Sequence, residues 1–240
     1  MTIPMPEIIL RANTPAELRA RLAELDIDVP PRSDGRRKHH AERYCIAHLL
    51  ATLPAEQFLF PLTLTHSDKP DFLLAMHGAN VGIEHTEAVP ENIAHADFLR
   101  EKEGLGPDVY FTPHVKPGEP KKTSDELRRE IEADESGSGW CGDSPEREWA
   151  AAMAHYVKEK MPKATAEGFV RYPANWLIVY DNWPLPAINY SKAATYLTPL
   201  LTEMAAFSVF DAIFVHDDSH MSEFRNVPVT QMLRPLQAPK

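Results

Sequence analysis

Apolar residues recur along the first half of the chain with the spacings of one helix and three strands. In "RKHHAERYCIAHLLATLP", Tyr44, Ala47, His48 and Ala51 share one helical face, and Pro54 ends the pattern. The runs "FLFPLTLTHS" and "PDFLLAMHG" are typical of strands, and "ANVGIEHTEAV" alternates apolar and polar residues. A helix, two strands and a turn at "HGAN" before a third strand are therefore predicted in this order.

The second half of the chain predicts alternating helices and strands. Helical patterns follow Pro90, cover "SPEREWAAAMAHYVKEKM", and cover "YSKAATYLTPLLTEMAAF", where Pro199 is expected to interrupt or kink the helix. The runs "NWLIVYDN" and "FDAIFVHDD" are typical of buried strands. This alternation of strands and helices predicts an α/β fold.

The remaining segments are interpreted as additions to one domain that spans residues 1–240. Residues 1–35 form an N-terminal extension with a short helix, capped by Thr14 with Glu17 three residues later. Residues 104–143 are rich in Pro, Gly and charged residues, which predicts a partly mobile insertion that contains one charged helix. Residues 222–240 are expected to be an irregular tail.

Composition and charge limit the class of protein. The chain has 240 residues, of which 43% are hydrophobic, and its formal net charge is -10. Its longest apolar runs are shorter than the roughly 20 residues that span a bilayer. Its first residues lack a secretory pattern, and Cys45 and Cys141 form no CxxC pair, so a reduced cytoplasmic protein is expected. The acidic total argues against a surface coated with positive charge, but it allows a local basic groove.

Two carboxylates mark the second and third predicted strands. Asp71 opens the strand "PDFLLAM", and Glu84 lies thirteen positions later in the strand "VGIEHTE". Alternation places Glu84 and Thr86 on one face of this strand, and His85 and Glu87 on the other. A turn between the strands would bring Asp71 alongside Glu84. Two such carboxylates form an oxygen site of the kind that Mg²⁺ or Mn²⁺ prefers.

The pattern "PDF" followed by "GIEHTE" resembles the PD-(D/E)XK signature of the restriction-endonuclease-like nucleases. The resemblance implies a core of the order α-β-β-β-α-β over residues 39–180, with a central mixed sheet flanked by helices. It also implies that Asp71 and Glu84 bind Mg²⁺ or Mn²⁺, and that Glu42 on the first core helix completes the site. The implied activity is the metal-dependent hydrolysis of phosphodiester bonds.

One residue departs from the signature, because Thr86 stands where the family has a lysine. Some branches of the family supply this lysine from the following core helix, and "AHYVKEKMPK" offers Lys158, Lys160 and Lys163. Lys160 is the preferred candidate and Lys158 the next, while Pro162 can end the helix before Lys163. Glu87 is expected to be an extra metal ligand or to hold a water molecule.

A basic run leads into the first core helix. Arg36, Arg37 and Lys38 precede Glu42 and are expected to contact a phosphate backbone. We therefore predict a divalent-metal-dependent endonuclease that acts on nucleic acid, with DNA favoured over RNA and a homodimer as an arrangement that could cut both strands. The alternative is a catalytically impaired fold that serves as a nucleic-acid-binding or protein-interaction module. Neither a GxSxG nor a Walker A fingerprint is present, so serine hydrolase and NTPase activities have no support.

Overall fold

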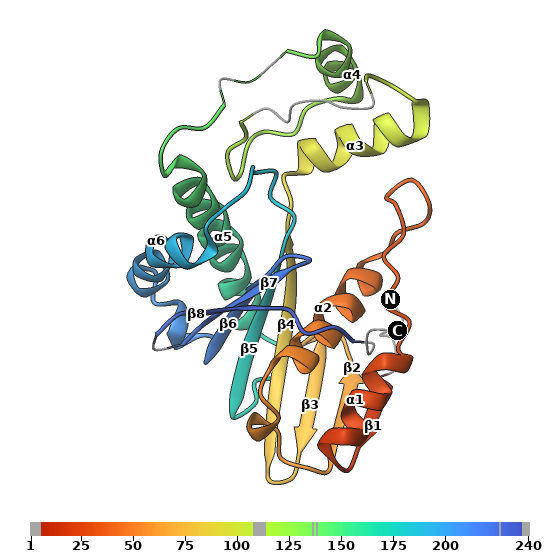
Figure 1. Ribbon diagram of the computed structural model, residues 1–240, viewed down its shortest axis with the longest axis vertical. Coiled ribbons are helices and arrows are strands. Elements are labelled where there is room, and N and C mark those ends of the chain that lie inside the picture. Colours follow the sequence, from red (N-terminus) through yellow and green to blue (C-terminus); the bar gives the residue numbers. More distant parts are fainter. Residues whose placement is uncertain (1–5, 108–113, 136, 138, 226, 237–240) are drawn as a thin grey trace.

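The computed structural model describes residues 6–107, 114–135, 137, 139–225 and 227–236. Within them, an eight-stranded mixed sheet forms the centre of an α/β fold, with helices on both faces (Figure 1). The strands are β1 (Glu7–Ala12), β2 (Leu62–His66), β3 (Phe72–Met76), β4 (Ala79–Ala88), β5 (Ala174–Asp181), β6 (Ala212–His216), β7 (His220–Phe224) and β8 (Val229–Met232). The helices are α1 (Pro15–Glu24), α2 (Lys38–Thr52), α3 (Glu91–Glu103), α4 (Ser124–Ala133), α5 (Ser144–Ala164) and α6 (Tyr190–Glu203), with short 3₁₀ turns η1 (Ala55–Gln57) and η2 (Ala206–Ser208).

Neighbouring strands of the sheet follow one another in the sequence, from β1 to β8. Strands β1 to β4 form an antiparallel meander, β4, β5 and β6 are parallel, and β7 and β8 return antiparallel. The parallel pairs require long crossovers, which α3, α4 and α5 provide between β4 and β5, and α6 between β5 and β6. The β3–β4 pair needs only the two-residue turn at His77 and Gly78, where Gly78 adopts a φ of 76°.

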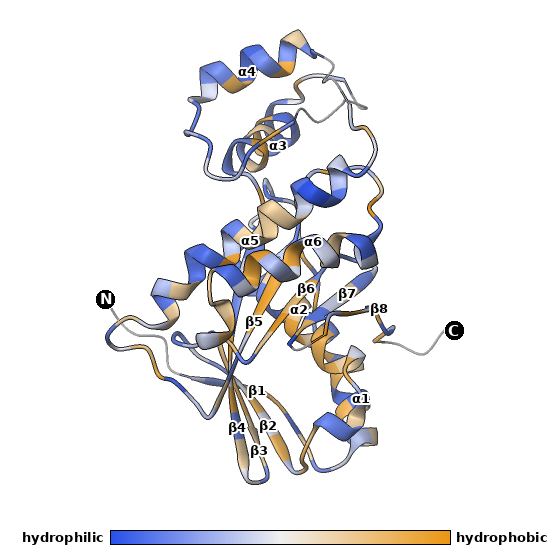
Figure 2. Ribbon diagram, turned by 90° about the vertical axis from the view of Figure 1, so that its left-hand side faces the viewer, coloured by the Kyte–Doolittle hydropathy of each residue, from blue (hydrophilic) through white to orange (hydrophobic). Residues whose placement is uncertain are grey.

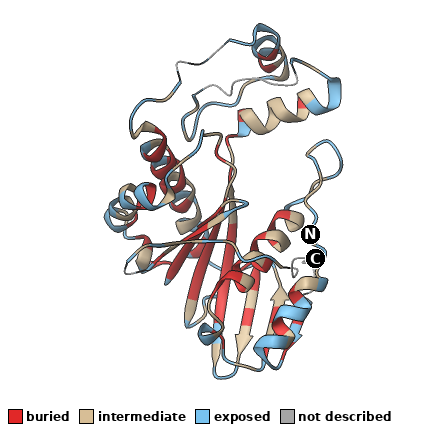
Figure 3. Ribbon diagram, in the orientation of Figure 1, coloured by how far each residue is buried: buried red, intermediate tan, exposed pale blue. Residues whose placement is uncertain are grey.

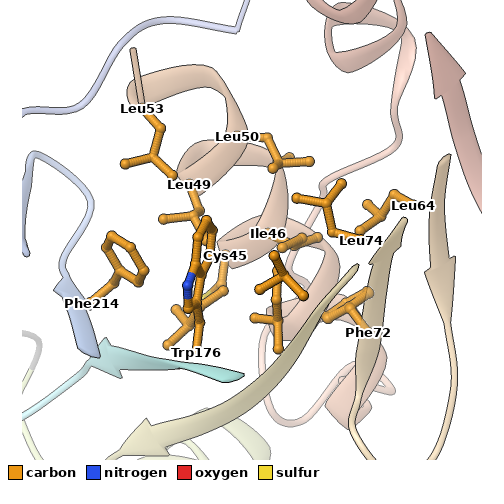
Figure 4. Close-up of a cluster of buried hydrophobic side chains, with 14 of the residues drawn as sticks. Cys45, Ile46, Leu49, Leu50, Leu53, Leu64, Phe72, Leu74, Trp176 and Phe214 are labelled. Carbon is orange, nitrogen blue, oxygen red and sulfur yellow. The ribbon is translucent and has the colours of Figure 1, made fainter. Parts of the chain in front are cut away.

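Two hydrophobic cores lie on opposite faces of the sheet. Under α1 and α2, the side chains of Ile46 and Leu49 pack with Phe72 of β3 and Trp176 of β5 (Figure 4). Under α5 and α6, Trp149 and Leu197 pack against β5 and β6. The central strands are accordingly the most buried part of the molecule (Figure 3), and apolar residues concentrate in the sheet and on the helix faces toward it (Figure 2).

The N-terminal segment adds a strand to the sheet that was not predicted from the sequence. Helix α1 and its cap are confirmed, since Thr14 Oγ1 accepts a hydrogen bond from Glu17 N at 3.1 Å. Strand β1, however, pairs antiparallel with β2 and buries Leu10 and Ala12. The six residues of β1 give only a weak strand signal by themselves. Their partner strand, β2, lies about fifty residues later in the sequence.

The C-terminal segment also differs from the expected irregular tail. Residues 220–224 and 229–232 form β7 and β8, which extend the sheet beyond β6. Both strands are short, and β8 has exposed side chains at Val229 and Met232, so neither carries the continuous apolar run of a central strand. Hydrogen bonds to the neighbouring strand stabilise them, and these contacts are invisible in the local sequence.

The predicted insertion contains the expected charged helix, α4, which packs on α3 through Leu99, Leu127 and Ile131. Part of the mobility expected there concerns residues 108–113, 136 and 138, which lie outside the described residues. Neither proline ends its helix, because α5 continues through Pro162 and α6 through Pro199. No helix in the described part of the chain combines the length and the apolar character needed to cross a membrane.

Candidate active site

The β3–β4 hairpin places Asp71 directly opposite Glu84. Phe72 pairs with Ile83, and the next position outward in the same antiparallel register brings Asp71 against Glu84. The Asp71 N–H donates to Glu84 Oε1 at 3.2 Å, and the His85 N–H donates to Asp71 Oδ2 at 2.8 Å. The side chains are therefore fixed by the backbone of the hairpin, at the end of β3 far from the turn.

Lys160 of α5 contacts both carboxylates. Its Nζ lies 2.7 Å from Glu84 Oε2 and 3.8 Å from Asp71 Oδ2, and its side chain is only 12% exposed. Glu84 faces α5 because it pairs with Leu177, whose side chain belongs to the core under α5. Lys158 is exposed on another face of the same helix. Of the three lysines that the sequence offered on this helix, Lys160 is the one that the structure brings to the carboxylates.

Glu42 reaches the pair from α2 through a second lysine. Lys38 Nζ lies 2.6 Å from Glu42 Oε1 and 2.6 Å from Asp71 Oδ1. The other oxygen of Glu42 lies 3.0 Å from His66 Nε2 at the end of β2. The result is a chain of alternating charges that runs from Glu84 through Lys160, Asp71 and Lys38 to Glu42. Lys38, expected from the sequence to contact phosphate, here bridges two acids.

Burial controls the electrostatics of this cluster. Burial raises the pKa of Asp71, and it raises the pKa of Glu84 together with the repulsion from Asp71, although Lys160 opposes both shifts. Glu42 differs, because hydrogen bonds from His66 and Lys38 outweigh its burial and lower its pKa to about 2. Three carboxylates thus share two ammonium groups, and this surplus of negative charge favours an additional cation.

Glu87 does not join the carboxylate pair. Its Oε1 accepts hydrogen bonds from Arg32 at 2.7 Å, from Arg36 at 2.8 Å and from Asn182 at 2.8 Å. From the sequence, Glu87 was expected to bind the metal or to hold a water molecule. In the structure its carboxylate instead binds the guanidinium groups of Arg32 and Arg36. Alternation explains it, since Glu87 lies on the opposite face of β4 from Glu84.

A basic pocket of about 350 Å³ opens beside the cluster. Its lining includes the basic run Arg36, Arg37 and Lys38 at the start of α2, together with Lys160 and Thr86. Two further cations line it: Arg32, which sequence reasoning missed, and Lys163, the third lysine offered by the sequence, which α5 includes because it continues past Pro162. Arg32 carried no sequence signal, because its contact with Glu87 joins residues 55 positions apart.

Carboxylate oxygens are the donors that a hard cation such as Mg²⁺ prefers. Among the described residues, no group of three or more His, Cys, Asp or Glu side chains is arranged to hold an ion. Mg²⁺, however, ordinarily takes one or two carboxylates from the protein and completes its shell with water and substrate phosphate. Asp71 and Glu84 supply such a pair.

Comparison of the chain with protein-family models, curated proteins and solved structures finds no match.

Asp181, at the end of β5, is a second perturbed carboxyl outside the cluster. It accepts hydrogen bonds from Trp149 Nε1 at 2.5 Å and from the Trp183 N–H at 3.1 Å. Burial nevertheless raises its pKa to about 7 from the ordinary 3.8. Between these values the native state holds a proton that the unfolded state has released, so the free energy of unfolding falls as pH rises toward 7 and is level above it.

We expect Asp181→Asn to remove this dependence. One proton contributes a slope of at most about 1.4 kcal/mol per pH unit, so the wild-type curve should fall more steeply than that of the variant across the window. Denaturant unfolding at a series of pH values measures both slopes. A changed hydrogen bond would shift the unfolding free energy of the variant by the same amount at every pH and would leave the slope unaffected. Equal slopes for the wild type and the variant would contradict the raised pKa of Asp181.

Proposed function

We propose that this protein is a divalent-metal-dependent nuclease with a restriction-endonuclease-like core. One observation carries the proposal: Asp71 and Glu84 meet across the β3–β4 hairpin, and Lys160 reaches both of them from the following core helix. A lysine beside two carboxylates on adjacent strands is the constellation that the PD-(D/E)XK resemblance implies. Lys160 would take the place of the motif lysine that Thr86 cannot provide.

The order of elements supports the same proposal. Helix α2, strands β2, β3 and β4, helix α5 and strand β5 follow the order α-β-β-β-α-β of that family, with α3 and α4 inserted before α5. Glu42 lies on the first helix of this series, as the resemblance implies for an additional acidic residue. The strand that bears Glu84 is central, with β3 antiparallel on one side and β5 parallel on the other.

Each residue has a role that follows from its position. Asp71 and Glu84 would hold the ion, and Glu42 would join them directly or through water once Lys38 moves aside. The Lys38 side chain is 66% exposed, so its ammonium can leave Asp71 for a substrate phosphate without crossing the core. Lys160 is held at the carboxylates, where it would orient the attacking water and offset phosphate charge.

A bound Mg²⁺ or Mn²⁺ would supply an activated water and would stabilise the charge that develops on the scissile phosphate. The protein contributes a fixed pair of carboxylates, a fixed ammonium group and a basic pocket for the strand. With the ion, these parts would support in-line attack by water on a phosphodiester: a P–O bond to water forms, the P–O bond to the leaving sugar oxygen breaks, and that oxygen takes up a proton, with no covalent intermediate on the protein.

The direct test is a cleavage panel of single- and double-stranded DNA and RNA with Mg²⁺, Mn²⁺ or EDTA. We expect hydrolysis of DNA in the presence of either ion and none with EDTA, because the buried carboxylates need the ion to act on phosphate. Gel electrophoresis of end-labelled substrates reports cleavage and its products. Equal products with and without EDTA would refute a metal-dependent mechanism.

A nucleic-acid-binding module without catalysis is the second candidate. The observation that favours it is that both carboxylates already contact ammonium groups, from Lys38 and Lys160. Calorimetric titration with Mn²⁺ separates the two functions. A nuclease should bind the ion in a manner that Glu84→Gln abolishes, whereas a binding module should show no site that depends on Glu84.

A further inference from the structure

Two arginines are fixed side by side at the edge of the candidate active site. Arg32 and Arg36 each use Nη2 to bind the same oxygen of Glu87, at 2.7 and 2.8 Å, and Asn182 donates to that oxygen as well. The side chains of the two arginines are only 26% and 17% exposed. Both belong to the segment before α2, and Glu87 attaches them to β4. Within the described part of the chain neither guanidinium makes a second hydrogen bond, which leaves N–H groups for a ligand.

This pair lines the basic pocket that opens beside the carboxylates. Among the described residues, six cationic side chains and a single acid, Glu87, line this pocket of about 350 Å³. The cations are Arg32, Arg36, Arg37, Lys38, Lys160 and Lys163. Four of these cations are paired with Glu42, Asp71, Glu84 or Glu87, so six cations face four acids, and this excess of positive charge favours an anionic group.

The lining favours phosphate over stacked bases and adenine edges, although arginine can also contact guanine. Of the described residues that line the pocket, none is Phe, Tyr, Trp, Asn or Gln, the side chains that stack on bases or read the edges of adenine. Guanidinium groups with free N–H pairs bind phosphate oxygens in bidentate fashion. A second pocket, of about 730 Å³, shares Arg32 and Arg36 and continues toward α3. The two arginines therefore lie where the two pockets meet.

We infer that Arg32 and Arg36, fixed by Glu87, form a clamp for a backbone phosphate near the one that is cleaved, and that this clamp reads no base. The inference rests on the proposed nuclease function and adds a site to it. Glu87 is a positioning residue here, because it acts through the arginines. Nuclease specificity at this position would then be for the sugar-phosphate backbone, independent of sequence.

The clamp can be tested by binding alone, without cleavage. Fluorescence anisotropy with a labelled oligothymidylate in EDTA measures affinity across a series of salt concentrations. We expect Arg32→Gln and Arg36→Gln to weaken binding by about tenfold each and to lower the salt slope by about 0.7 for each phosphate that is no longer neutralised. Arg21→Gln is the matched control, since Arg21 is exposed on α1 and makes one surface ion pair with Glu24. An Arg32 variant with the affinity and slope of this control would overturn the clamp.

Glu87→Gln gives a result whose direction separates positioning from general charge. If the pocket attracted phosphate only through its net charge, removal of an acid would tighten binding. If Glu87 fixes the arginines, the same substitution should weaken binding by severalfold, although the protein becomes less acidic. Gln keeps the size of the side chain and a hydrogen-bond acceptor, so circular dichroism should show an unchanged fold. Tighter binding by this variant would refute the positioning role.

An oligonucleotide of abasic units tests the second half of the inference. We expect Arg32→Gln to reduce the affinity for the abasic, oligothymidylate and oligoadenylate probes by the same factor. A loss confined to one base would show that the clamp reads sequence, contrary to the inference. All these binding measurements use EDTA and are therefore independent of cleavage. If the protein cleaves no substrate but the arginine variants bind more weakly, the nuclease proposal is refuted and the phosphate clamp is retained.

Discussion

Asp71→Asn is expected to reduce Mg²⁺-dependent cleavage by about three orders of magnitude or more, because an ion held at the reacting phosphate contributes several kcal/mol. The substitution removes one of two carboxylates that would hold the ion and leaves the shape of the side chain. Asn can still accept the hydrogen bond that the His85 N–H donates to Asp71. Because burial raises the pKa of Asp71, a neutral side chain at this position should cost little stability.

Initial rates on a labelled DNA substrate, with thermal unfolding measured in parallel, check this expectation. Asp68→Asn is the matched control, since Asp68 is an exposed aspartate three positions earlier and its variant should cleave at the wild-type rate. An Asp71 variant that retains the wild-type rate and stability would remove the basis of the proposed function. A variant that unfolds would instead be replaced by Glu84→Gln, which tests the opposite member of the pair.

Lys160→Met is expected to lower the cleavage rate by about a hundredfold or more, the usual cost of removing one preorganised electrostatic contact from a transition state. Methionine keeps the apolar stem and removes the ammonium that lies 2.7 Å from Glu84. Two buried carboxylates then lack this counter-ion, so we also expect a loss of about 2 kcal/mol in the free energy of unfolding. Lys160→Arg should retain part of the activity, because it keeps the charge but changes its geometry.

Lys158 provides the control for this prediction, since it lies two positions earlier on the same helix and is exposed. Lys158→Met should leave both rate and stability unchanged. Added Mg²⁺ should raise the melting temperature of Lys160→Met more than that of the wild type, because the ion can replace the missing positive charge. Equal effects of Lys158→Met and Lys160→Met on the rate would argue against a role for Lys160 in catalysis.

Local patterns were sufficient to predict the centre of the site. Asp71 and Glu84 belong to one short hairpin, whose alternation and turn determine which side chains face each other. The separation of Glu84 from Glu87 by face could likewise be read from the sequence, although the partner of Glu87 could not. The resemblance added Glu42 and the choice of a lysine on α5, and Lys160 is the residue found at the carboxylates.

Contacts between distant segments could not be predicted. Arg32 lies in a loop rich in Pro and Gly, and its position depends on Glu87, 55 residues later. The position of Lys38 between Glu42 and Asp71 depends on how α2 packs over β2 and β3, which no periodicity specifies. Strands β1, β7 and β8 were missed for a related reason, since short strands at the sides of a sheet are stabilised by their neighbours more than by their own sequence.

Both carboxylates belong to one continuous segment, the β3–β4 hairpin, which the turn at His77 and Gly78 closes. Adding or deleting one residue between Asp71 and Glu84 would turn one carboxylate toward the wrong side of the sheet, unless a bulge absorbed the change. The interval should therefore tolerate length variation only in steps of two, whereas the chain between α3 and α5 can lengthen or shorten without disturbing the pair. If the hairpin were grafted onto another protein, it would bring Asp71 and Glu84 with it. A helix of that protein would have to supply the lysine, because Lys160 belongs to α5.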